Sequence, residues 1–162
     1  MIDTSAWHPK LRRLNDYWRS IHPRDGLPGR QHLDPLAIPD ILPHLWLMDV
    51  QRGPFRLKYR LLGTLLVEWI GKDHTGRWLD EVHPHVLESA DPLAQGTGAL
   101  PRLKSVVDTG VPNWRRGKPT LFLAHKDFVE IERLVLPLAS DGRNVDVLIA
   151  ATVFHREVRS TA

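Results

Sequence analysis

FRLKYRL, residues 55–61, alternates an apolar with a basic side chain at every step. Successive side chains of a β-strand point to opposite faces, so this alternation predicts a half-buried strand over Phe55–Leu61. The turn residues Arg52-Gly53-Pro54 separate it from a second strand-length segment, His44–Gln51. Two strands joined by so short a turn predict a β-hairpin.

The last third of the chain predicts three more strands, and the middle predicts helices. Strands grouped towards both ends, with helices between them, predict an α+β fold with an antiparallel sheet rather than a parallel doubly wound one. The Asp-Gly dipeptide within Ser140–Arg143 favours a tight hairpin turn between the last two strands. These strands are Trp114–Leu123, Asp127–Ala139 and Val145–His155. The helical segments are a short helix at Pro39–Leu42, Thr64–Ile70 closed by Gly71, Trp78–Val82, and one kinked or two short helices in 85–107, interrupted at Gly96-Thr97-Gly98 and Pro101.

The N-terminal segment carries one apolar stripe at alternating spacings of four and three, which is typical of an amphipathic helix. His22-Pro23 ends this helix. Its two heptads are too few for a free-standing coiled coil, so the stripe has to pack on its own domain or on a second copy of the chain. The stripe consists of Trp7, Leu11, Leu14, Trp18 and Ile21.

Composition excludes several classes of protein. A length of 162 residues suits one domain, and the absence of Cys excludes disulfides, thiolate nucleophiles, Cys-ligated zinc and iron–sulfur clusters. The apolar runs are strand-length, and no signal peptide is recognisable, so we expect a cytoplasmic protein without a membrane segment. The net charge of +3 is small and does not demand an anionic partner.

Four motifs in this order resemble a compact stand-alone family of bacterial PAS domains. They are PLAIPDILPHL at 35–45, RLLGT at 60–64, GKDHTG at 71–76 and ERLVLPL at 132–138. The resemblance extends from about Leu11 to Phe154. It implies a five-stranded antiparallel sheet with short helices on one face, formed by residues 26–157. Residues 1–25 would form the amphipathic helix and 158–162 a disordered tail.

The resemblance also implies a non-enzymatic sensory or signalling module. Ligands of PAS domains lie between the concave face of the sheet and the central helices, and the N-terminal helix often makes a homodimer. The stripe from Trp7 to Ile21 is therefore the candidate dimer interface, and a separate protein partner would receive the signal. Flavin photochemistry through Cys is excluded because the chain has none. Haem is not expected, since Val86–Gly110 holds no His for an axial ligand; His83 and His85 lie just upstream.

Arg133 is the polar residue that we single out for binding. It shares a strand face with the apolar residues Val129, Ile131 and Val135, and a buried Arg needs a carboxylate or a ligand anion. Two interpretations stay open: Arg133 orients an anion in the pocket, or it pairs with an internal acid, Glu68 or Asp49. The other candidate pocket residues are the ring-bearing side chains Tyr59, Trp69, Trp78, Phe122 and His125, which core packing also explains.

Three further patterns give weaker indications of function. His74, His83 and His85 near Glu81 and Glu88 have metal-ligand chemistry, but a solvated junction explains them and we predict no metal site. The basic stretch Trp114–Lys118, with Arg56, Lys58 and Arg60, favours nucleic-acid binding as one alternative, although charge that protects an edge strand explains it as well. No catalytic constellation is recognisable. A protein-interaction adaptor with a filled core is the other alternative to the sensor.

Overall fold

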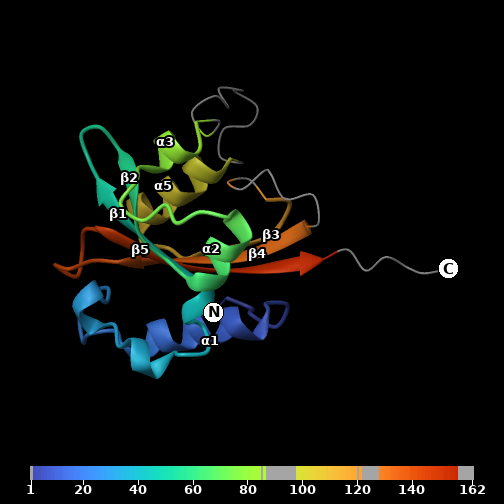
Figure 1. Ribbon diagram of the computed structural model, residues 1–162. Helices are drawn as coiled ribbons and strands as arrows, with labels where there is room; N and C mark the ends of the chain where they lie inside the picture. Colours follow the sequence, from blue (N-terminus) through green and yellow to red (C-terminus); the bar gives the residue numbers. More distant parts are fainter. Residues whose placement is uncertain (1, 85, 87–97, 120, 122–127, 157–162) are drawn as a thin grey trace.

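The five predicted strands form one antiparallel sheet. A computed structural model describes residues 2–84, 86, 98–119, 121 and 128–156 of the chain (Figure 1). The strand order is β2-β1-β5-β4-β3, and every neighbouring pair is antiparallel. The α+β prediction is therefore confirmed. The strands are β1 (Leu45–Gln51), β2 (Arg56–Leu62), β3 (Asn113–Gly117), β4 (Phe128–Leu138) and β5 (Val147–Arg156).

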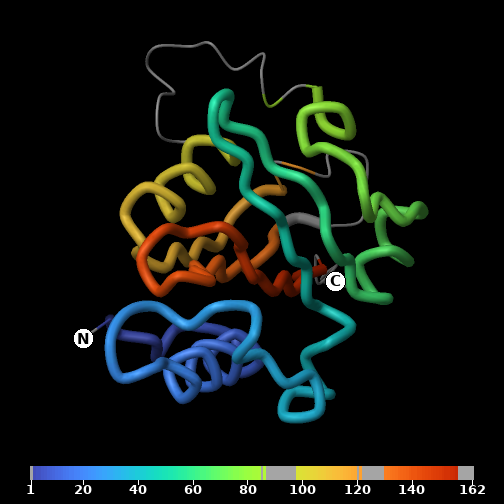
Figure 2. The backbone as a smooth tube through the Cα atoms, turned by 90° about the vertical axis from the view of Figure 1, so that its left-hand side faces the viewer, coloured from blue at the N-terminus to red at the C-terminus, as the bar shows by residue number. Residues whose placement is uncertain are grey.

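Helices cover both faces of this sheet in two different layers. The N-terminal helix α1 lies on one face, and α2, α3 and α5 lie on the other, so the sheet is the middle layer in both views (Figures 1 and 2). We call these the α1 face and the inner face. The α-helices are α1 (Pro9–Ser20), α2 (Thr64–Ile70), α3 (Leu79–Val82) and α5 (Ala99–Thr109), and 3₁₀ turns lie at 30–32, 35–37 and 42–44.

Each face of the sheet has its own apolar core, as the alternation of strand side chains requires. In β1, Leu45 and Leu47 pack towards α1, whereas Trp46 and Met48 pack towards the inner helices. In β4, Leu134 and Leu136 face α1 and Val135 faces inward. The central strands are thus buried on both sides, which explains why the second half of β4, residues 134–138, and most of β5 are nearly continuous apolar runs rather than alternating ones.

Two glycines, Gly63 and Gly71, determine where α2 begins and ends. Gly71 ends α2 in the left-handed region at φ +82°, and its N–H donates to the carbonyl of Val67 at 2.8 Å, as predicted for a C-cap. Gly63, in the RLLGT motif, donates its N–H to the carbonyl of Leu45 at 2.6 Å. A Cβ at Gly63 would collide with the carbonyl oxygens of Leu42 and Pro43. Only glycine allows the chain to leave β2 and enter α2 this closely.

Two local predictions were wrong. Pro101 does not interrupt a helix, because it lies in the first turn of α5, where its missing N–H has no helical partner to lose. The hairpin between β4 and β5 is not a tight turn, since Leu138 pairs with Val147 and residues 139–146 form the loop. In that loop the Asp141 carboxylate accepts hydrogen bonds from the backbone N–H groups of Arg143 and Asn144 at 2.8 and 2.7 Å. The Asp-Gly pair therefore makes an Asx-type turn within a longer loop.

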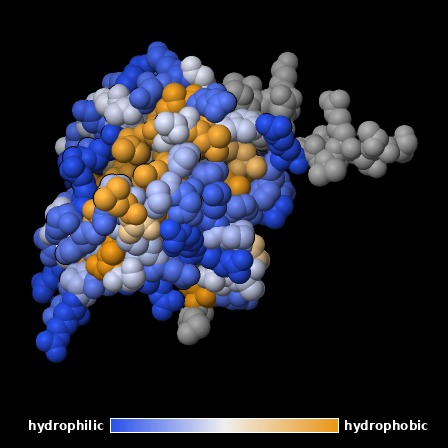
Figure 3. Space-filling model, turned by 60° about the horizontal axis from the view of Figure 1, so that its bottom comes forward, coloured by the Kyte–Doolittle hydropathy of each residue, from blue (hydrophilic) through white to orange (hydrophobic). Residues whose placement is uncertain are grey.

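The apolar stripe of α1 packs on the chain's own sheet. Leu11 and Leu14 are fully buried there, the indole of Trp18 donates to the carbonyl of Pro137 at 2.9 Å, and Trp7 stacks on Trp114 of β3 at 5.8 Å between ring centroids. Of the predicted stripe only Ile21 is partly exposed. These candidate dimer residues are thus largely covered within one chain, and the homodimer itself stays a prediction. Figure 3 shows the α1 side of the molecule, where patches of apolar atoms lie between hydrophilic ones.

Several predictions fall on residues outside the described ranges. They include the first part of the 85–107 helical segment, with Gly96 and Thr97, and the tail 158–162. In the described part of the chain, no helix has both the length and the apolar character that a membrane crossing requires.

Candidate functional site

A small cavity lies on the inner face of the sheet. Its volume is about 20 Å³, which is room for one water molecule. Its walls come from β1, β2, β4, β5 and the segment after β3, and they are mostly apolar. The lining residues are Trp46, Tyr59, Pro119, Leu121, Ile131, Arg133, Thr152 and Phe154.

Strand register brings the wall residues together. Arg133 of β4 lies directly opposite Thr152 of β5, and Ile131 lies opposite Phe154, so all four side chains emerge on the same face. The Thr152 hydroxyl accepts a hydrogen bond from the indole Nε1 of Trp46 at 2.9 Å. The cavity therefore has one hydroxyl already held in place beside one guanidinium.

Arg133 is the unusual member of this wall. Its side chain is 2% exposed, and its Nε and Nη2 are wholly shielded with no hydrogen-bond partner among the described residues. Neither predicted internal acid pairs with it: Asp49 binds Arg60 at 2.7 Å, and Glu68 is exposed. Burial lowers the pKa of Arg133 to about 9, and the charges of Arg115 and Arg102 add to that shift. At neutral pH the guanidinium is charged and buried without a described counterion.

Two more arginines lie beside Arg133. Arg115 of β3 is its direct cross-strand partner, so both side chains emerge on the inner face. Arg102 comes from α5, which packs against β3 and β4. Nη1 of each is shielded and has no hydrogen-bond partner within the described part of the chain. Burial lowers the pKa of both. A Cβ at Gly117 would approach Nη2 of Arg115 to 2.9 Å, so glycine leaves the space that this guanidinium occupies.

A hydrogen bond links the cavity wall to α3 and its following turn. The hydroxyl of Tyr59 lies 2.8 Å from Nε2 of His83, both side chains are buried, and either group is the donor depending on the tautomer of His83. Burial raises the pKa of Tyr59, which keeps the phenol protonated. His74 lies 6.3 Å from each of these rings, between centroids. No group of three metal-ligating side chains occurs in the ranges that the structure describes.

The structure brings only part of the predicted pocket together. Tyr59 and Arg133 line the cavity. Trp69 of α2 stacks on the wall residue Phe154 at 4.9 Å between centroids. Trp78 lies elsewhere, with the guanidinium of Arg56 over its ring at 4.2 Å. Phe122 and His125 lie outside the described residues. Sequence reasoning missed Trp46, Thr152 and Phe154, because only the pairing of β1, β5 and β4 places them beside Arg133.

The basic side chains considered for nucleic-acid binding are largely paired with acids of the chain. Arg56 makes a two-pronged contact with Asp80 at 2.7 and 2.9 Å, and Arg116 contacts Glu130 at 2.8 Å. Arg60 is held by Asp49, and Arg115 is directed inward. These pairs leave little uncompensated positive charge on the strand faces, which disfavours that alternative.

On the α1 face, the neighbour of Arg133 in sequence is a buried acid. Glu132 is 2% exposed, and its carboxylate accepts hydrogen bonds from the backbone N–H of His8 at 2.9 Å and the indole of Trp114 at 3.3 Å. His155 Nε2 lies 2.8 Å and Arg116 3.7 Å from its other oxygen. Burial alone would raise the pKa of Glu132, but the bonds from His8, His155 and Trp114 outweigh it and leave the pKa below its ordinary value. The carboxylate joins the start of α1 to β3, β4 and β5.

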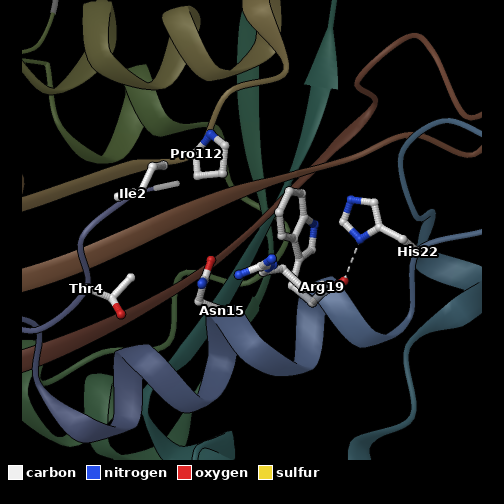
Figure 4. A pocket seen from close by; sticks show the side chains of 7 residues that line it. Ile2, Thr4, Asn15, Arg19, His22 and Pro112 are labelled. Atoms are coloured by element: carbon white, nitrogen blue, oxygen red, sulfur yellow. Dashed lines mark hydrogen bonds between the residues drawn. The ribbon is translucent and has the colours of Figure 1, made fainter.

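A second hollow of about 360 Å³ opens at the surface between α1 and the segment before β3. In Figure 4, Asn15, Arg19 and His22 approach it from α1 and the turn after it, and Ile2 and Pro112 from the opposite side. His22 Nδ1 lies 2.8 Å from the carbonyl of Trp18. This hollow has one buried polar side chain, Asn15, and lacks the concentration of charge found at the inner cavity.

Comparison with known proteins identifies the family. Among similar solved structures is an RNA-binding light-oxygen-voltage receptor, which is 16% identical with a TM-score of 0.45 over 95% of this chain and 36% of that one, so the chain spans about a third of its length. Another is a LOV protein of Rhodobacter sphaeroides, which is 12% identical with a TM-score of 0.44 over 93% of this chain and 70% of that one. No curated protein matches. A family model described as PAS domain matches residues 6–151, and the chain therefore belongs to the PAS domain family.

Proposed function

We propose that this PAS domain is a non-enzymatic sensor that binds a small molecule in the inner cavity and relays binding to a separate protein partner. The observation that carries the proposal is Arg133, whose guanidinium is buried at the cavity wall without a described partner. Burying an unpaired charge is costly, so such a group at a cavity wall is a candidate for ligand binding. Membership of a family of sensory domains supports the same function.

The contacts around the cavity supply two routes by which binding would reach the surface. Tyr59 connects the cavity wall to α3 through His83. On the other side, β3 directs Arg115 to the inner face, while the adjacent Trp114 stacks on Trp7 just before α1. A displacement of β3 at the cavity would therefore also move Trp7 and the start of the N-terminal helix. The high pKa of the buried Tyr59 opposes phenolate formation, and we assign no catalytic role to it.

The alternative is a protein-interaction adaptor, and the size of the cavity favours it. Ligand pockets usually have volumes of about 300–1,000 Å³, far above the 20 Å³ of this cavity. A sensor with so little space takes only a small group, or the end of a larger ligand, into its interior. In either case the site of action is the cytoplasm, and a homodimer remains part of the proposal.

Native mass spectrometry of the intact chain purified from its own host tests the sensor. We expect an additional mass that accompanies the folded chain and is lost on denaturation. The same spectrum reports whether the chain is a dimer. A folded chain that carries no additional mass under gentle conditions, yet retains a protein partner in a pull-down, would favour the adaptor and contradict the sensor.

A further inference from the structure

We propose that the inner cavity receives the anionic end of its ligand, a carboxylate or phosphate group, on the guanidinium of Arg133, with Arg115 and Arg102 contributing further positive charge. The inference rests on the proposed function and names the chemical class of the ligand. Nothing in the family assignment supplies that class.

The two shielded nitrogens of Arg133 define the shape of the missing partner. Nε–H and one N–H of Nη2 lie on the same edge of the planar guanidinium and point in parallel, which is the fork that binds two oxygens of one carboxylate or phosphate. Both nitrogens lack a hydrogen-bond partner among the described residues. The unsatisfied atoms are therefore the pair that a single oxyanion satisfies at once.

Charge around the cavity points to the same class. Arg115 and Arg102 are close enough to lower the pKa of Arg133, and no described acid pairs with any of the three. Four acids, Glu88, Asp91, Asp127 and Glu157, lie outside the described residues. Like charges brought together in a poorly hydrated place repel one another, so the cluster gains most from a ligand that carries one or two negative charges.

The polar surroundings also fit an oxyanion. Thr152, opposite Arg133, accepts a hydrogen bond from the indole N–H of Trp46, so its own hydroxyl proton is available for donation to a ligand. The remaining wall is apolar, with Leu121, Ile131 and Phe154. The cavity of about 20 Å³ has room for one water molecule and none for an aromatic ring, so a carboxylate or phosphate head would enter it only with a small displacement of the wall.

Thermal unfolding of the full chain, followed by the fluorescence of its six Trp residues, tests the inference. The probes are sodium acetate, sodium propionate and inorganic phosphate, each compared with sodium chloride at equal ionic strength. Acetamide and propionamide serve as uncharged counterparts of the two carboxylates. We expect at least one anion to raise Tm in a saturable manner and the amides to leave it unchanged. A larger rise in Tm with acetate and propionate would indicate a carboxylate ligand, and a larger rise with phosphate would indicate a phosphate ligand.

Matched variants locate the effect. Arg133→Met should abolish the anion-dependent rise in Tm, and Arg115→Met should weaken the apparent affinity about tenfold, the factor that about 1.4 kcal/mol represents. Arg116→Met is the control, since it removes the same charge from the adjacent residue of β3, on the other face. We expect its response to stay within twofold of the unsubstituted chain. The Nε–H resonance of Arg133 in ¹H–¹⁵N spectra of the unsubstituted chain should shift on titration with the active anion, which needs no variant to fold.

Different results would contradict the anion site and the sensor function. An unchanged Tm and an unmoved Arg133 resonance with all three anions would overturn the anion site, and so would an equal loss of response in Arg116→Met. If the protein from its host then carries an uncharged molecule, the sensor stands and only the ligand class is wrong. If the anions bind at Arg133 but the protein from its host carries no ligand, the anion site stands and the resident-ligand part of the sensor proposal is wrong.

Discussion

Glu132 and Arg133 are neighbours on β4, are equally buried at 2% exposure, and face opposite sides of the sheet. The carboxylate of Glu132 is surrounded by donors from α1, β3 and β5. The guanidinium of Arg133 has none of its shielded nitrogens satisfied by the described residues. Removing the partners of a buried, fully bonded charge is costly, and a buried charge left without partners lowers stability from the outset. The α1 face thus holds its buried charge within the fold, whereas the inner face leaves one unpaired, in keeping with our proposal that the inner face binds a ligand.

The largest effect is expected from weakening the bonded member of the pair. Glu132→Gln keeps the shape but replaces one acceptor oxygen with a donor NH₂, which faces either His8 and Trp114 or His155, so hydrogen bonds to a charged group are lost. We expect the free energy of unfolding to fall by about 2–3 kcal/mol in urea denaturation. Glu130→Gln, at the exposed ion pair with Arg116, is the control and should cost less than about 1 kcal/mol. Equal losses of unfolding free energy in the two variants would contradict a structural role for Glu132.

A smaller effect is expected at the link between the cavity wall and α3. Tyr59→Phe removes the hydroxyl that lies 2.8 Å from His83 and leaves the ring in place. The loss of one buried hydrogen bond should lower the free energy of unfolding by about 1 kcal/mol. Tyr17→Phe, which removes an exposed hydroxyl bonded to the backbone of Asp34, provides the comparison and should cost less. A larger loss for Tyr17→Phe than for Tyr59→Phe would argue against a structural link through the cavity wall.

The smallest effect is expected from mild acid, and it again separates the two faces. The pKa of Glu132 in the folded chain lies below its ordinary value of 4.5. Its contribution to stability is therefore complete above about pH 4.5 and is lost as the pH falls through the lower folded value. Urea unfolding between pH 3 and 6 should show a shallower dependence in Glu132→Gln than in the unsubstituted chain. Identical slopes in the two proteins would contradict the bonded state of this carboxylate.

Local patterns in the sequence predict most of the fold. The period-two alternation of residues 55–61 specifies β2, and Gly71 marks the end of α2 where the structure has it. Pro101 and the Asp-Gly pair misled because both residues suit more than one local structure: Pro fits a first helical turn, and Asp-Gly fits an Asx-type loop. The partner of the α1 stripe was left open for a different reason, since an amphipathic stripe shows that it packs but not on which surface.

The site is less predictable than the fold, because it depends on strand register. Arg133 was recognisable as a charge on an apolar strand face, and the structure places it at the cavity. Thr152 and Phe154 join it only because β5 pairs with β4 in the observed register, which no local pattern reveals. Glu132 was missed, although its position in an apolar run that is covered on both faces was a usable signal for a buried acid.

The most direct test of the contrast is the free energy of unfolding of Arg133→Met, measured in a buffer without carboxylate, phosphate or sulfate. Met has a similar length and no charge, so relieving an unpaired buried guanidinium should increase stability by about 1 kcal/mol or more. An increase, opposite in sign to the loss in Glu132→Gln, is the result that the account predicts. A loss of about 2 kcal/mol or more would show that the guanidinium is paired within the chain, and that the inner face, like the α1 face, is built for structure.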